Sequence, residues 1–128
     1  MMIRLSPTFF IFATALFSIF LAVASIAEAA AVKRGTIRGQ SVKYTTGTVT
    51  LDKMGSRYTI KLSGSFKTKA GPGLYLYLGN GSPQKRIGKL RASGAQSVRV
   101  PAGVDPAKYS TVYIYCAPFR AIFGSARW

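Results

Sequence analysis

The one thiol of this 128-residue chain, Cys116, lies in the aromatic segment STVYIYCAPFRAIFG at 110–124. A cysteine thiolate can attack a disulfide, ligate a metal or be oxidised to sulfenic acid. The N-terminus, described below, predicts export, and exported domains usually pair their cysteines or lack them. One unpaired thiol in such a protein is either a reactive group or a small apolar side chain in the core. The nearby Arg120 would favour the thiolate, whereas apolar packing would favour the thiol. Both interpretations stay open at this point.

Aromatic residues surround Cys116 in the sequence. Tyr113, Tyr115 and Phe119 all lie within three positions of it. If Cys116 is a redox centre, these rings are the residues expected to line its site or to contact a cofactor of unspecified kind. If Cys116 is a core residue, the same rings simply pack around it.

The other residue types exclude most catalytic machinery. The chain has no histidine, which removes the usual general base, zinc ligand and haem ligand. Of its three carboxylates only Asp52 and Asp105 remain if a leader containing Glu28 is removed. No acids or thiols cluster at metal-ligand spacing, and the glycine segments GPG and GNG lack the phosphate-loop pattern. We expect no metal site, and a protein that is not a stand-alone enzyme.

A strong positive charge suggests a different class of function. Lysine and arginine total 18 against three acids, which gives a formal net charge of +15. Such a field attracts polyanions, although an ordinary solvated surface is the alternative. The densest cationic cluster lies in PQKRIGKLR at 83–91 and consists of Lys85, Arg86, Lys89 and Arg91. Anionic lipids, cell-wall polymers and acidic protein patches are the partners considered.

The N-terminus predicts export. Arg4 precedes an apolar stretch over 8–26, and Ala27-Glu28-Ala29 fits a cleavage site, so residues 1–29 are predicted to be a signal peptide. An uncleaved membrane anchor is the alternative, because the stretch approaches the roughly 20 residues of a spanning helix. We expect a periplasmic, cell-envelope or extracellular protein that contacts membrane only through this segment. Export disfavours nucleic acid as a partner.

The elements that position these residues are predicted to be strands. Short β-branched and aromatic runs recur between turn signals over 30–128, which predicts an all-β fold, a single β-sandwich or small barrel after the signal helix. Segments 41–51 and 57–63 are expected to form a hairpin around a turn at 53–56. Segments 74–78 and 111–116 are expected to be central strands covered on both faces. Segment 98–100 should end at Pro101, and 31–40 is expected to be loose.

Several segments in order resemble the DM13 domain family. They are Gly47 to Leu51, Phe66, Gly71 to Leu78, Gly88 to Leu90, Gly94 to Gln96, Val100-Pro101, and Tyr109 to Ala126 with its Y-x-x-V, cysteine and F-x-x-x-F-G-x-A positions. The resemblance covers most of 30–128. This chain departs from the family at Gly73, where aspartate is common, and at Tyr115, where tryptophan is common.

The resemblance implies an extracytoplasmic β-sandwich-like domain of the kind that accompanies DOMON and cytochrome b561 modules. It also implies a role in electron transfer with Cys116 as the redox group. Three hypotheses follow: an exported redox accessory served by a separate redox protein, a basic binding module for anionic envelope components, and a structural domain with Cys116 in the core. In the third, the tail FGSARW or an edge strand docks onto another protein.

Overall fold

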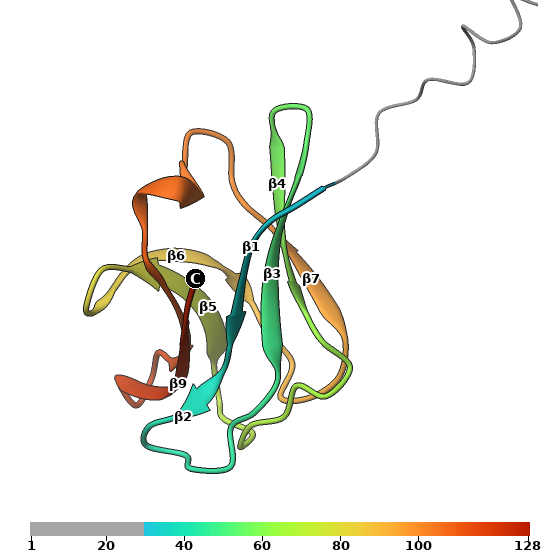
Figure 1. The fold of residues 1–128 in the computed structure, drawn as a ribbon. Coiled ribbons are helices and arrows are strands. Elements are labelled where there is room, and N and C mark those ends of the chain that lie inside the picture. Colours follow the sequence, from blue (N-terminus) through green and yellow to red (C-terminus); the bar gives the residue numbers. More distant parts are fainter. Residues whose placement is uncertain (1–29) are drawn as a thin grey trace, which may run out of the picture.

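The computed structural model describes residues 30–128, which form nine strands and one short 3-10 helix (Figure 1). The elements are β1 (Ala30–Thr36), β2 (Arg38–Gly39), β3 (Thr48–Met54), β4 (Arg57–Leu62), β5 (Leu74–Gly79), β6 (Pro83–Lys89), β7 (Gln96–Arg99), η1 (Pro106–Lys108), β8 (Thr111–Cys116) and β9 (Ala121–Arg127). The predicted signal peptide, residues 1–29, lies outside the described residues. Residues 30–128 contain no helix with the length and apolarity needed to cross a membrane.

Two antiparallel sheets face each other in this fold. One has four strands in the order β1-β3-β4-β7, and the other has five in the order β2-β9-β8-β5-β6. The chain passes from the first sheet to the second between β1 and β2, where Ile37 is buried. The expected all-β sandwich is confirmed, and the β1–β2 passage gives it a barrel-like closure on one side.

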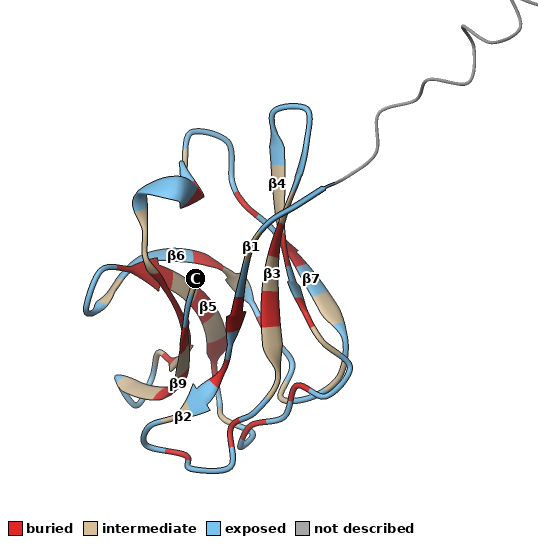
Figure 2. Cartoon of the chain, viewed as in Figure 1, coloured by how far each residue is buried: buried red, intermediate tan, exposed pale blue. Residues whose placement is uncertain are grey.

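The core lies between the sheets, because side chains alternate between the two faces of a strand. Phe66 is its largest fully buried side chain, and most of the others are buried aliphatic side chains of the inner faces (Figure 2). They are Val49, Leu51, Ile60 and Leu62 from the first sheet, and Leu74, Leu76, Leu78, Val112 and Ile114 from the second. The three leucines of segment 74–78 (LYLYL) therefore share one face of β5, as their alternation with tyrosine predicts.

Glycines let the two sheets approach closely along both sides of the sandwich. A Cβ on Gly88 of β6 would lie 2.6 Å from Cγ1 of Val98 of β7. A Cβ on Gly35 of β1 would collide with the backbone of Arg127 of β9. Real Cβ atoms do not tolerate such short contacts. The two sheets therefore approach this closely at both sides because Gly35 and Gly88 have no side chain.

The last residue, Trp128, ties the first strand to the last. Its Nε1 donates a hydrogen bond of 2.9 Å to the carbonyl oxygen of Tyr109. The ammonium of Lys33 in β1 lies 5.8 Å from the centroid of its indole ring. The contact is a weak cation–π interaction, and it places the tryptophan at the side where β1 and β9 meet.

Several expected strands are confirmed and several elements differ. The 41–51 and 57–63 hairpin exists as β3–β4, but it starts at Thr48, because 41–47 turns and Gly47 has φ +121°. The central strands β5 and β8 are confirmed. The segment 31–40 is not loose, since it forms β1 and β2. The tail FGSARW is not an exposed docking segment, because it belongs to β9 between β2 and β8.

Candidate functional site

Strand β8 carries Cys116 at its end and turns it into the core. Cys116 pairs with Leu74 of β5 and with Ala121 of β9. It shares the inner face of the sheet with Val112 and Ile114, and its exposed fraction is 0%. The thiol is free. The alternation of 111–116 is therefore as the sequence predicted, with the sulfur on the apolar side.

Gly71 packs directly against the thiol. A Cβ built on Gly71 would lie 2.9 Å from Sγ of Cys116 and 3.5 Å from Cε2 of Phe123. Gly71 is half-buried and its neighbour Pro72 is exposed, so a segment at the surface contacts the buried sulfur. The sequence drew attention to this GPG segment, but only the fold shows that it contacts the thiol.

The segment around Gly71 is held to the end of β8. The backbone N–H of Ala117 donates a hydrogen bond of 2.9 Å to the carbonyl oxygen of Gly73. A Cβ on Gly73 would lie 3.0 Å from Cδ of Pro118. A side chain at this position would press against Pro118, so the glycine permits a close fit between these two turns.

The aromatic residues expected around the thiol do not surround it. Tyr113 and Tyr115 alternate with Cys116 and therefore lie on the opposite, outer face of the five-stranded sheet. Tyr113 is 4% exposed and Tyr115 is half-buried, whereas Phe119 is 63% exposed in the β8–β9 turn. The cofactor role of these three residues stays a prediction, and a ligand of the two tyrosines would lie across the sheet from the sulfur.

The outer tyrosines form a cluster with Arg86 of β6. Its guanidinium lies 4.0 Å from the ring centroid of Tyr75, and its Nε donates a hydrogen bond of 3.0 Å to the hydroxyl of Tyr77. By accepting this hydrogen bond, Tyr77 raises the pKa of Arg86 above its ordinary value. The rings of Tyr77 and Tyr115 meet edge to face, 5.0 Å apart at 64°.

The predicted cationic cluster lies along the exposed edge of the same sheet, but its members are divided. Lys85, Arg86 and Lys89 belong to β6, whereas Arg91 follows it. Arg86 is turned onto the tyrosines. The guanidinium of Arg91 donates a hydrogen bond of 3.0 Å to the carbonyl oxygen of Ala95. Two of the four cations thus have contacts within the fold, and polyanion binding by this set stays a prediction.

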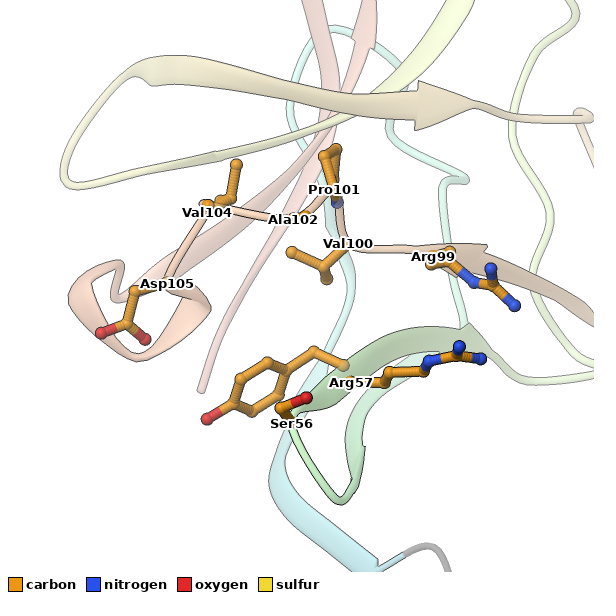
Figure 3. A pocket seen from close by; sticks show the side chains of 10 residues that line it. Ser56, Arg57, Arg99, Val100, Pro101, Ala102, Val104 and Asp105 are labelled. Carbon is orange, nitrogen blue, oxygen red and sulfur yellow. The ribbon is translucent and has the colours of Figure 1, made fainter.

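A cavity of about 620 Å³ lies between the β3–β4 hairpin and the loop after β7, and the sequence had not indicated it (Figure 3). Its apolar lining includes Tyr58, Val100 and Val104, while Arg57 and Arg99 extend together to one side (Figure 3). The Asp105 carboxylate is used to cap η1, since it accepts a 3.0 Å hydrogen bond from the N–H of Ala107.

The thiol does not line this cavity. The cavity is bounded by the β3–β4 turn and by residues 99–105, which precede η1, whereas Cys116 ends β8. Within the described part of the chain, no three acids, thiols or histidines gather into a potential metal site. The chemistry of the thiol must therefore be argued from its own surroundings.

The chain matches one family. The family described as "DM13: Electron transfer DM13" matches residues 38–128, which span β2 to β9 and include both Gly71 and Cys116. No curated protein and no solved structure matches the chain. The buried thiol, the glycine packed against it and the two-sheet sandwich are thus features of the matched region, and the chain belongs to the DM13 family of electron-transfer domains.

Proposed function

We propose that the chain is an exported redox accessory domain in which Cys116 exchanges with a disulfide of a separate partner protein. Membership of a family named for electron transfer supports a redox role. The observation that carries the proposal is the direct packing of half-buried Gly71, which has exposed neighbours, against the thiol.

The proposed step is thiol–disulfide exchange. The Cys116 thiol loses its proton to solvent, and the thiolate attacks one sulfur of the partner's disulfide. A mixed disulfide forms as the partner's S–S bond breaks, and the other partner sulfur leaves as a thiolate. Since the chain has no second cysteine, a small-molecule thiol completes the reaction by attacking the Cys116 sulfur of the mixed disulfide. The partner then leaves with both of its sulfurs reduced to thiols, and Cys116 is left in a disulfide with the small thiol.

Access to the thiol requires a local opening. Cys116 is fully buried, so a second sulfur reaches it only when the segment around Gly71 moves away. Lys69, Ala70 and Pro72 in this segment are exposed. Segments with little buried surface open more readily than the core strands they cover. The closed state would protect the thiol from oxidants other than the partner.

The test is the rate at which the folded protein forms a mixed disulfide with glutathione disulfide, measured at increasing urea below the unfolding transition. Reaction through local opening is expected to show a rate that hardly changes with urea, because little surface is exposed. A rate that rises with urea in proportion to global unfolding would show that Cys116 is only a core residue. The Cys116→Ser variant controls for non-thiol adducts.

A further inference from the structure

We propose that the outer face of the five-stranded sheet binds an acidic polysaccharide through a site over Tyr113, flanked by Arg38 and Arg127. This site is separate from Cys116, which lies on the inner face of the same sheet. It overlaps the cationic cluster of 83–91 only at Arg86, which ends the same row of side chains, whereas its flanking arginines come from β2 and β9. The observations that carry it are strand register, cavity lining and charge.

The register aligns one row of side chains across all five strands. Arg38 pairs with Ser125, Ser125 with Tyr113, Tyr113 with Tyr77, and Tyr77 with Arg86. Directly opposed residues lie on the same face of a sheet, so the row starts and ends with a guanidinium and has two tyrosines between them. Its four interstrand steps span about 19 Å at about 4.8 Å each. That length suits a short oligosaccharide.

Two adjoining cavities lie along the β2–β9 part of this row. One, of about 430 Å³, is lined by side chains that include Gln40, Asn80, Ser110, Tyr113, Ser125 and Arg127. The other, of about 400 Å³, is lined by Thr36, Arg38, Ser125 and Arg127. Because Ser125 and Arg127 line both, the two cavities adjoin at these residues, and Arg38 lines the second cavity. The two cavities together are here called the depression.

The polar groups of the depression are held in place by one another. Nε2 of Gln40 donates a 3.0 Å hydrogen bond to Oγ of Ser125. Oδ1 of Asn80 accepts a 2.8 Å hydrogen bond from the N–H of Ser110, and its Nδ2 donates one of 3.1 Å to the carbonyl oxygen of Lys108. Such fixed amides and hydroxyls suit a ligand that carries many hydroxyl groups, because they recognise it without first having to be ordered.

Tyr113 lies beneath the centre of this depression. It lines one of the two cavities but is only 4% exposed, so it contributes little surface of its own. Its buried ring supports the polar lining from below.

The charge of the depression selects an acidic ligand. No carboxylate lines either cavity. In the described chain the one salt bridge joins Lys61 to Asp52 on the other sheet, so Arg38 and Arg127 are not neutralised by an acid. Guanidinium groups bind carboxylates through paired, charge-assisted hydrogen bonds. A polymer with hydroxyls and carboxylates on its rings matches both the arginines and the polar lining.

Nucleic acid fits this face less well. Base stacking needs an aromatic ring with an open face. Here Arg86 covers the ring of Tyr75, and the rings of Tyr77 and Tyr115 meet edge to face. The outer face of the four-stranded sheet provides a contrast, since its rows contain Thr50, Lys61 and Ser97 without aromatic residues.

The experiment measures binding of an oligogalacturonate, in which each sugar carries a carboxylate, to the full chain by calorimetry at fixed ionic strength. The Arg38→Gln/Arg127→Gln double variant is expected to bind about tenfold or more weakly, as the loss of charge-assisted hydrogen bonds implies. The matched control is Arg34→Gln/Arg99→Gln, which removes the same charge from the other sheet and should change affinity less than about twofold.

Three results would overturn the proposal. Equal losses in the two double variants would mean that only net charge matters. Equal binding of a neutral maltooligosaccharide would mean that the arginines do not select the ligand. Tighter binding of oligothymidylate that depends on Arg38 and Arg127 would identify a nucleic-acid surface instead. Cys116→Ser is expected to bind the oligogalacturonate unchanged, so this proposal and the redox proposal fail separately.

Discussion

At the scale of single residues, the contact between Gly71 and Cys116 is the feature on which the redox proposal depends. The sequence predicted the strand that carries Cys116, because alternation along 111–116 is a local property, and it left open whether the thiol is reactive or buried. It could not predict this contact, since Gly71 and Cys116 are distant in sequence and meet only through the pairing of β5 with β8. Arg38, Ser125 and Arg127 were missed for the same reason.

A double-mutant cycle tests this contact. Gly71→Ala is expected to destabilise the protein by about 1–3 kcal/mol, because the new methyl group overlaps Sγ. Cys116→Ala should cost about 1 kcal/mol through a small cavity. The double variant should cost less than the sum by about 1 kcal/mol, since the methyl group fills that cavity. Urea unfolding measures all three.

Gly64→Ala is the matched control for this cycle. Nothing lies within 4 Å of a Cβ at Gly64, so its free energy of unfolding should change by less than about 0.5 kcal/mol. Strict additivity of the two core substitutions would show that Gly71 and Cys116 do not touch in solution.

At the scale of elements, strands were predictable where apolar residues alternate and were missed where they do not. β5 and β8 have apolar or aromatic residues at nearly every position, which is typical of central strands. β6 was not predicted as a strand, because as an edge strand it buries little besides Ile87 and its sequence is marked mainly by its cations. Gly124 in β9 packs against Thr45 and the backbone of Arg38, and a glycine within a strand weakens the pattern.

Hydrogen exchange should rank the strands by their place in the sheets. Amides of Leu76 and Ile114, in the paired central strands β5 and β8, are expected to exchange only through global unfolding. The two-residue edge strand β2 should exchange by local opening, orders of magnitude faster. Uniform protection across all strands, read by NMR at one pH, would contradict this order.

At the scale of the whole molecule, charge opposes folding. Residues 30–128 contain 17 of the 18 lysines and arginines but only two carboxylates, and Asp52 has the one salt bridge described. Compaction brings these like charges together and costs free energy that salt reduces. Composition alone predicted this excess of positive charge. The fold was needed to show which cations lie beside the tyrosines on the outer face of the five-stranded sheet and which lie on the outer face of the four-stranded sheet.

The melting temperature should therefore rise with salt. Between about 10 mM and about 150 mM sodium chloride we expect an increase of about 4 °C or more, which corresponds to about 1 kcal/mol for a domain of this size. Lys85→Glu/Lys89→Glu changes two exposed positions of β6 and should make the increase smaller. Calorimetry that finds no change, or a decrease, in the unmodified protein would contradict the role of self-repulsion.

The position of Trp128 makes the protein its own optical reporter. It is the only tryptophan of the chain, so selective excitation at the red edge of the absorption band isolates its emission from that of the seven tyrosines. Its indole is held by the Tyr109 carbonyl and lies beside Lys33, hence its emission colour and polarisation respond to the separation of the first strand from the last. Fluorescence would thus report in real time when β1 separates from β9, without any attached dye.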